Sequence, residues 1–443
     1  MRILLIQAPL GRSEPVVYPL GLAFLAGALR AHDVVVFDPN LPDSNTGKLR
    51  DIIAQHQPEL IGFSLRNIDS QMLRDLHFYL PPFQELVRDV RRSATAASLV
   101  VGGAGFSLFP EEVMARTPEL DLGVRLEGEK TFAALAGGQA AASLPGIYYR
   151  KNGRVTANPP GPFQDFSELP DPDWNTVNVA PYAGQRGAVG IQTKRGCHLK
   201  CAYCTYPLLN GRQIRRRDPA VVVDEIEYLV RERGVRHFTF VDSMLNIPED
   251  HAWRILELLH QRRLPAKWSG WFHERPLTEE MVKLALAAGC DEFQFSPDAY
   301  NDRALAALHK EATTADIDKV IALLERMPGM RASFNFFINP PHNDLRTTLR
   351  LLKLFVRAKT QWRDRISGFV LASPRVEPDT AIYARAVREG VVDAALPLLP
   401  ESVEGLKRLF YYNRGTAYVE YAFRAYIRAW KLRQRLRRGG SVA

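Results

Sequence analysis

Two successive series of short apolar runs, each run followed by a segment of helical periodicity, constrain the fold of this 443-residue chain most strongly. Strands that alternate with helices build parallel sheets. Each crossover helix brings the chain back to the end of the sheet at which the previous strand began. The first series predicts strands at Arg2–Ile6, Asp33–Phe37, Leu60–Phe63, Ser98–Val101 and Leu122–Leu126, with helices at Leu20–Arg30, Gly47–His56 and Leu76–Arg92. We therefore expect an α/β protein that opens with a Rossmann-like, doubly wound sheet.

The second series has six strand–helix units. Its strands are predicted at Ala188–Thr193, His237–Asp242, Ala266–Trp271, Asp291–Ser296, Ala332–Ile338 and Gly368–Ala372. Six units are two short of a closed eight-unit barrel, so we expect a (β/α)6 partial TIM barrel. Its site should lie at the carboxyl ends of the strands.

Composition marks the limits between these regions. Six prolines between positions 159 and 181 punctuate a polar stretch without periodicity, which we interpret as a connector across the surface. The predicted order is a Rossmann-like domain at 1–145, a Pro-rich connector at 146–186, the partial barrel at 187–390 and a helical, basic C-terminal extension at 391–443. A chain of this length is also longer than the chains that fold around a single hydrophobic core.

The net charge of +9 belongs to the C-terminal extension. Ten Lys and Arg residues and one acid, Glu420, fall between Lys407 and Arg438, so the remainder of the chain is electrically balanced. The charge therefore gives no reason to expect nucleic acid at the main site. No stretch approaches the roughly 18 apolar residues of a membrane span, and the N-terminal apolar run is too short for a signal peptide. We expect a cytoplasmic protein.

Three of the four cysteines, Cys197, Cys201 and Cys204, form a C-x3-C-x2-C pattern directly after the first strand of the second series. Thiols this close suit a metal or redox centre better than disulfides in a chain of this size. A structural zinc site needs a fourth ligand, and His198 is too close to Cys197 to bind without strain. A cubane iron–sulfur cluster accepts three thiolates and leaves one iron open. Cys290 opens another strand, so one cluster is expected.

The segment KRGCHLKCAYC resembles the cluster-binding loop of the radical S-adenosylmethionine (SAM) enzymes, and the barrel pattern matches their fold. The resemblance implies a 4Fe-4S cluster held by the three clustered cysteines, with its open iron chelating SAM. One-electron reduction would then cleave a carbon–sulfur bond of SAM and give a 5′-deoxyadenosyl radical. A low-potential electron donor such as flavodoxin or ferredoxin is implied as a partner.

The same resemblance implies further cofactor-binding residues: Tyr203, Asp242, Ser296, Asp298, Asn339 and Arg375. Tyr203 matches an aromatic residue that faces adenine, and Asp242 matches a polar group at the amino end of SAM. Asp298 departs from the pattern, because Ser-Pro-Asp stands where the family has Gly-x-Glu-Ser. These residue types are equally typical of a capping Asp, a helix-starting Pro or a surface Arg.

Segments before the cysteine loop resemble the cobalamin-binding domain of cobalamin-dependent radical SAM enzymes: YPLGLAFLAGALR, IGFSLRNID, VVGGAGFSLFPEEVM and RLEGEKTF. The resemblance implies a corrin across the carboxyl edge of the first sheet, near Ser64, Gly102, Gly103 and Gly128, facing the cluster. Ordinary turn glycines would give the same pattern. The Asp-x-His-x-x-Gly motif that supplies a histidine to cobalt in other cobalamin proteins is absent, as it is from many radical methylases of this class.

The chain is thus similar to class B radical methylases. This similarity implies methylation of a poorly activated carbon or phosphorus of a small molecule, a specialised metabolite, with methylcobalamin as the donor and a second SAM as the radical source. No side chain is needed as a general base, so no catalytic residue is predicted. Radical rearrangement or cyclisation, and 3-amino-3-carboxypropyl transfer, remain alternative activities. A non-enzymatic iron–sulfur protein is a third interpretation.

Overall fold

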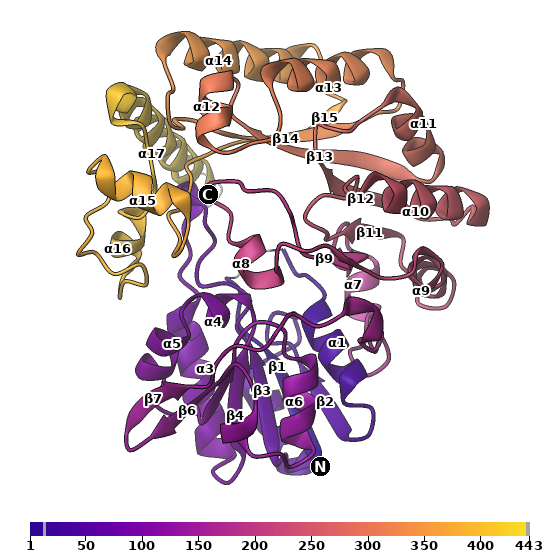
Figure 1. Cartoon of the computed structure of the whole chain (residues 1–443), viewed down its shortest axis with the longest axis vertical. Helices are drawn as coiled ribbons and strands as arrows, with labels where there is room; N and C mark the ends of the chain where they lie inside the picture. The colour runs from indigo at the N-terminus through magenta and orange to yellow at the C-terminus, as the bar shows by residue number, and fades with distance from the viewer. Residues whose placement is uncertain (12–14, 440–443) are drawn as a thin grey trace.

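The computed structural model describes residues 1–11 and 15–439, and its N-terminal domain is built on one mixed sheet (Figure 1). The strands run in the order β2–β1–β3–β4–β5–β6–β7, and those from β1 to β5 pair in parallel. Their bounds are β1 Arg2–Gln7, β2 Asp33–Phe37, β3 Leu60–Ser64, β4 Ser98–Gly102, β5 Leu122–Val124, β6 Ile147–Lys151 and β7 Arg154–Ala157. The predicted Rossmann-like domain is therefore confirmed.

Helices cover both faces of this sheet, which explains why its strands are continuous apolar runs. One face carries α1 (Leu20–Ala28) and α6 (Glu129–Ala136), which pack on each other. The other face carries α2 (Thr46–His56), α3 (Leu80–Ser93), α4 (Ala104–Leu108) and α5 (Pro110–Arg116). In β1, residues 3 to 6 alternate between the two apolar cores and are fully buried.

The sheet continues beyond its five parallel strands into residues expected to be connector. β5, β6 and β7 pair antiparallel, so residues 147–157 form a hairpin on the edge of the sheet. Asn152 and Gly153 both have positive φ, as the two central residues of a tight hairpin turn require. The connector proper is the Pro-rich stretch that follows, with the short helix α7 (Ala180–Ala183) near its end.

The second domain is the predicted six-stranded open barrel. Its parallel strands run in the order β15–β14–β13–β12–β11–β8. They are β8 Val189–Ile191, β11 His237–Phe240, β12 Lys267–Phe272, β13 Cys290–Asp298, β14 Ala332–Phe337 and β15 Ile366–Ala372. The helices between them are α9 Pro219–Arg231, α10 Glu249–Arg262, α11 Glu279–Ala287, α12 Asp302–Ala307, α13 Thr314–Arg326 and α14 Leu345–Thr360.

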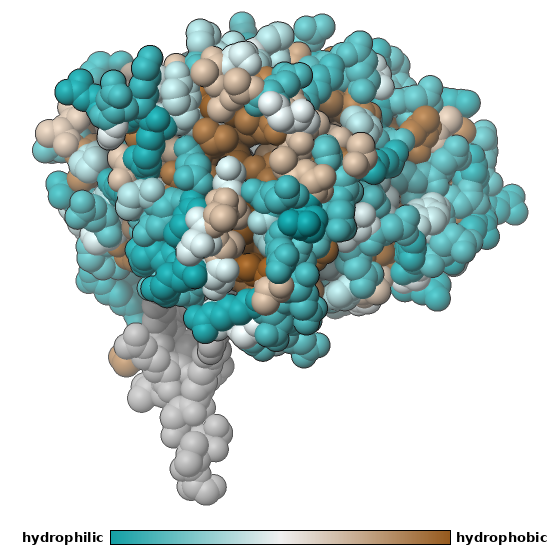
Figure 2. Space-filling model, turned by 90° about the horizontal axis from the view of Figure 1, so that it is seen from below, coloured by the Kyte–Doolittle hydropathy of each residue, from teal (hydrophilic) through white to brown (hydrophobic). Residues whose placement is uncertain are grey.

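The C-terminal part contains α15 (Ala381–Arg388), α16 (Val403–Lys407) and α17 (Ala417–Gly439), beside the barrel in Figure 1. The helical extension is thus present; within α17, Val419 is buried and Tyr426 is largely exposed. None of the described helices has both the length and the hydropathy of a membrane span. Seen from below in Figure 2, the surface is mainly hydrophilic, with apolar side chains gathered in and around a hollow.

Candidate active site between the two domains

The cysteine loop leaves the barrel directly after β8 and is closed at its base by a short antiparallel ribbon. Strands β9 (Lys194–Arg195) and β10 (Arg215–Arg216) form this ribbon. Within the loop, the Cys197 amide donates to the carbonyl of Gly211 at 3.1 Å, and the helix α8 (Tyr206–Asn210) follows the last cysteine. In Figure 1 this helix lies between the two domains, so the loop faces both of them.

The charges of the loop cysteines affect one another's pKa values. The pKa of Cys201 is raised to about 12, mainly by burial; Lys310 opposes the shift, and the charges of Asp298, Cys204 and Cys197 contribute to it. Among the described residues, no three Cys, His, Asp or Glu side chains converge closely enough for a single metal ion. A 4Fe-4S cluster binds each thiolate at a different iron, so its ligands stand farther apart than those of one ion. Three free thiols match the donor set of a 4Fe-4S cluster with one open iron.

Two further residues that could bind a metal, Cys290 and His198, do not join the three thiols. Cys290 is buried at the start of β13, where its thiol donates to the carbonyl of Glu292. His198 is exposed to solvent. These placements leave Cys197, Cys201 and Cys204 as the candidate ligand set.

A cavity of about 280 Å³ opens in the barrel beside Cys204. Four of the predicted SAM-binding residues line it: Tyr203, Ser296, Asp298 and Arg375. The Tyr203 hydroxyl donates to Asp298, and Lys310 forms a buried ion pair with the same carboxylate at 2.9 Å. Burial raises the pKa of Asp298, although Lys310 and Tyr203 oppose the shift. The carboxylate is thus held in place on the wall of the cavity.

Two other predicted residues lie away from this cavity. Both oxygens of Asp242 accept hydrogen bonds from Thr193 and Lys194, and its side chain is fully buried. Asn339 donates to the carbonyls of Asn413 and Thr416, so it anchors the C-terminal segment to the barrel. Both side chains therefore make hydrogen bonds within the protein, and their contacts with a cofactor stay a prediction.

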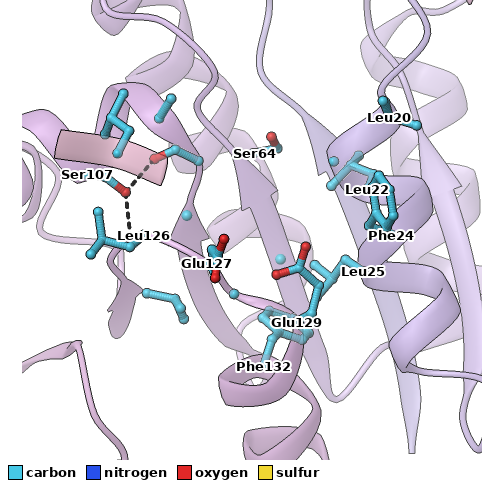
Figure 3. A pocket seen from close by; sticks show the side chains of 18 of the residues that line it. Leu20, Leu22, Phe24, Leu25, Ser64, Ser107, Leu126, Glu127, Glu129 and Phe132 are labelled. Carbon is cyan, nitrogen blue, oxygen red and sulfur yellow. Dashed lines mark hydrogen bonds between the residues drawn. The ribbon is translucent and has the colours of Figure 1, made fainter. Parts of the chain in front are cut away.

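A second cavity, also about 280 Å³, lies at the carboxyl edge of the N-terminal sheet. All four predicted cobalamin-side residues line it: Ser64, Gly102, Gly103 and Gly128. Figure 3 shows the apolar side chains of α1, including Leu22 and Phe24, on one side and Ser107 on the other. The carboxylates of Glu127 and Glu129 lie between these two walls.

Charged residues connect this second cavity with the cysteine loop. Arg195, two residues before Cys197, pairs with Glu129 at 2.6 Å, and Arg215 pairs with Glu127 at 2.7 Å. Burial alone would raise the pKa of Glu129, but the charge and hydrogen bond of Arg195 outweigh it, so the pKa lies below its usual value. The other oxygen of Glu129, Oε2, is buried without a hydrogen-bond partner among the described residues.

The second cavity fits an edge of cobalamin in the chemistry of its lining. Glycines leave room at the sheet edge, leucines and Phe24 offer an apolar wall, and Glu129 Oε2 is ready to accept from an amide group. The carboxamide side chains of a corrin carry such N–H donors. Among the described residues, those that line this cavity include no histidine.

A third, smaller cavity of about 70 Å³ connects these two in space. It shares Leu209 with the N-terminal cavity, and it shares Gln71, Thr205 and Glu377 with the barrel cavity. Its wall also includes residues 66–69, the loop after β3. The cysteine loop and the loop after β3 therefore meet where the two larger cavities approach each other.

Several residues of the site were not predicted from the sequence: Glu127, Glu129, Arg195, Lys310 and Glu377. Glu127 and Glu129 flank the predicted Gly128, and Glu377 lies two residues after the predicted Arg375. The sequence motifs therefore pointed to the segments that contain these carboxylates, although not to the carboxylates themselves. Lys310 lies on no recognisable motif. Its role depends on a contact with Asp298, twelve residues away, that only the fold creates.

Comparisons with known proteins agree with this architecture. Residues 6–136 match the B12 binding domain, and residues 191–354 match the radical SAM superfamily. An uncharacterized methyltransferase of Pyrococcus horikoshii is 25% identical over 407 residues, 88% of this chain and 84% of that protein. The anaerobic magnesium-protoporphyrin IX monomethyl ester cyclase of Synechocystis sp. is 25% identical over 343 residues, which are 74% of this chain and 66% of the cyclase.

Among solved structures, the radical SAM methyltransferase TsrM of Kitasatospora setae, with cobalamin and a 4Fe-4S cluster bound, has the same fold. The TM-score is 0.76 at 24% identity, over 89% of this chain and 80% of that one. The two domain matches stand in the order that the sequence predicts. Each of the two larger cavities is lined by residues of both domains. The chain therefore contains a B12-binding domain followed by a radical SAM domain.

Proposed function

We propose that this protein is a cobalamin-dependent radical SAM methyltransferase. In this proposal Cys197, Cys201 and Cys204 hold a 4Fe-4S cluster, the barrel cavity takes SAM, and the N-terminal cavity takes an edge of cobalamin. The methyl group goes to a poorly activated carbon or phosphorus of a small specialised metabolite. The Pyrococcus horikoshii relative and TsrM, both named as methyltransferases, support this choice.

The observation that carries the proposal is the junction of the two cavities at the cysteine loop. Cys204 lines the barrel cavity, and Leu209, five residues later, lines the N-terminal cavity. Bound there, the cluster would supply single electrons and an open iron for SAM, and cobalamin would supply a carrier for the methyl group. One short segment of chain thus touches both sites, as methyl transfer between them requires.

The residues of the chain position these groups and exclude water. Arg195 fixes the start of the cysteine loop against Glu129, and Asp242 fixes the preceding strand through Thr193 and Lys194. Tyr203 packs edge-to-face on Phe337 at 5.0 Å between ring centroids, so its ring is held in the cavity wall. None of these contacts requires a side chain to act as a general base in a radical step.

The other partners in this proposal are a small-molecule substrate and a low-potential electron donor such as flavodoxin or ferredoxin. A reducing compartment suits the free thiols, so we place the enzyme in the cytoplasm. Cyclisation is a second candidate activity, because a relative covering 74% of this chain is named as a cyclase. It would use the same cluster and SAM site but would leave the substrate without an added methyl group.

Anaerobic reconstitution with iron, sulfide and hydroxocobalamin tests the proposal. After desalting, we expect iron and corrin to remain bound, corrin at about one per chain, and SAM to be consumed under a low-potential reductant. Changing the three clustered cysteines to Ala should abolish the iron chromophore and SAM cleavage, whereas Cys290→Ala should leave the iron content unchanged.

The outcomes separate the candidate activities. Transfer of labelled methyl groups from SAM to bound corrin would support methyl transfer. An intact cluster without retained corrin would overturn the cobalamin part and favour cyclisation or aminocarboxypropyl transfer. SAM cleavage that survives loss of all three cysteines would refute the whole proposal.

A further inference from the structure

Glu377 is a buried carboxylate that borders two of the cavities described above. It follows β15 at the carboxyl edge of the barrel, and only 4% of its surface is exposed. One side of it lines the barrel cavity with Tyr203 and Cys204, and the other lines the small cavity between the domains with Thr205. A group bound to Glu377 would therefore lie between the candidate SAM and cobalamin sites.

One oxygen of this carboxylate is paired and the other is not. Oε1 accepts a hydrogen bond from Gln71 Nε2 at 3.0 Å. Oε2 is buried and has no hydrogen-bond partner among the described residues. Burial raises the pKa of Glu377 to about 7, and the charge of Asp69 adds to this shift while Arg375 opposes it. An unpaired buried oxygen costs stability, which is expected where a ligand completes the site.

The charges around Glu377 favour a cation as that ligand. Arg375 forms a buried ion pair with Asp69 at 3.2 Å, and it also donates to the carbonyls of Val376 and Leu398. Its Nε lies 4.0 Å from Oε1 of Glu377, the oxygen that Gln71 already satisfies. With Asp69 and Arg375 neutralising each other, an ionised Glu377 adds a negative charge to the cavity wall.

The barrel cavity has a polar part, with Ser296 and Asp298, which is assigned to SAM above, and an apolar part that suits the body of a second molecule. Beside Glu377 its lining includes Met72, Tyr203, Phe336 and Phe337. A volume of about 280 Å³ is at the lower end for small-molecule sites, so a macromolecular ligand is excluded from it. A molecule with an aromatic or aliphatic body and one positive nitrogen matches both parts of the lining.

We propose that Glu377 binds an ammonium group of the substrate, so that the substrate of this enzyme is a small amine with an apolar body. This proposal rests on the methyltransferase function proposed above, because it places the substrate between the two cofactor sites. Glu377 receives the ammonium group at Oε2, and Gln71 holds the carboxylate in place through Oε1. No covalent step is assigned to Glu377.

Binding of a model amine to the reconstituted holoenzyme tests this proposal. The probe is 2-phenylethylammonium, and its uncharged counterpart is 2-phenylethanol. Affinities are measured by equilibrium dialysis at pH 8, with SAM present, for the wild type, Glu377→Gln and Glu404→Gln. Glu404 is an exposed carboxylate on α16 paired with Lys407, so its variant is a matched control. Iron, corrin and SAM contents are determined for each protein.

We expect Glu377→Gln to weaken binding of the ammonium probe about tenfold or more and to change binding of 2-phenylethanol little. Glu404→Gln should bind both probes as the wild type does. Gln71→Met keeps the carboxylate but removes its hydrogen bond, so it should weaken ammonium binding less than Glu377→Gln does. This second variant keeps the test valid if Glu377→Gln folds poorly.

Three results would overturn the proposal. Equal ammonium binding by wild type and Glu377→Gln, or no binding by a fully loaded wild type, would remove the substrate role. Loss of SAM or corrin from Glu377→Gln, with unchanged probe binding, would assign the carboxylate to a cofactor. A wild type that retains neither cluster nor corrin would instead be a failure of the proposed function, and the cofactor contents identify that case.

Discussion

Lys310 and Asp298 illustrate how single residues shape the barrel site. Both are buried, their charged atoms are 2.9 Å apart, and Lys310 Nζ also donates to the carbonyl of Ser296 at 2.8 Å. Asp298 has a positive φ of 67°, which is uncommon for a residue other than glycine. The ion pair therefore holds a strained backbone position on the wall of the barrel cavity.

Replacing Lys310 with Met should destabilise the protein strongly. The change leaves the carboxylate of Asp298 buried without its cation, and breaking a buried pair in this way costs about 3–5 kcal/mol. Urea unfolding of the full chain measures the loss. Lys283→Met is the control, because Lys283 pairs with Glu279 on the exposed side of α11. We expect the control to unfold at the wild-type midpoint; equal losses in both variants would contradict the role of burial.

The site residues differ in how well the sequence could reveal them. Cys197, Cys201 and Cys204 were predicted because their local spacing alone limits the chemistry. Glu377 and Lys310 were not, because their roles depend on burial and on partners from other elements. Asp242 was assigned to a cofactor, yet its neighbours in the fold use both of its oxygens. The sequence alone does not show that both oxygens of Asp242 already accept hydrogen bonds within the protein.

At the scale of elements, the turn from β4 to α4 forms part of the N-terminal cavity. Gly103 has φ of 99° and ψ of 170°, a region of backbone space that is essentially limited to glycine. A Cβ at this position would lie 2.7 Å from the carbonyl oxygen of Leu65. The turn therefore brings the loop after β3 against α4, next to the cavity edge.

Gly103→Ala should lower the thermal unfolding temperature and weaken corrin retention, because the backbone of Leu65 must move. Gly138→Ala is the matched control, since Gly138 also has positive φ but a Cβ there would meet nothing within 4 Å. The control should lose about 1 kcal/mol from the backbone conformation alone. Gly103→Ala should lose at least about twice as much. Similar losses in calorimetry would show that the contact with Leu65 is unimportant.

The elements themselves were largely predictable. All eleven predicted strands are present, because an apolar run buried on both faces is a strong local signal. The hairpin of β6 and β7 was missed, since Tyr148 and Tyr149 are followed by charged residues and a Pro-rich stretch that obscure its pattern. Its pairing with β5 is long-range, and periodicity does not reveal which strand a hairpin joins.

At the scale of the whole molecule, buried histidines make the stability depend on pH. Burial lowers the pKa of His251 and of His273 from 6.5 to about 4 in each case. His251 Nε2 contacts Thr193 Oγ1 at 3.1 Å, and that hydroxyl donates to Asp242, so the ring nitrogen is the donor. A neutral His251 thus supports the strand that leads to the cysteine loop.

The free energy of unfolding should fall as the pH is lowered from about 6.5 to 4. In this window the unfolded chain binds protons at these histidines and the native chain does not, so protonation favours unfolding. Each histidine contributes up to about 3 kcal/mol over the window. Chemical unfolding at several pH values gives the slope of the free energy of unfolding against pH. We expect this slope to be smaller for His251→Gln than for the wild type. His260→Gln, on the exposed side of α10, should leave it unchanged; a variant slope equal to that of the wild type would count against the assignment.

The hairpin that extends the N-terminal sheet also has a consequence for self-association. Without it, β5 would offer its unpaired amide and carbonyl groups to another chain. With it, the sheet ends on β7, a four-residue strand whose exposed Arg154 lies opposite Lys151 on β6. Short, positively charged edges repel a second copy and limit strand pairing between molecules. The hairpin thus limits strand pairing between molecules at this edge of the sheet.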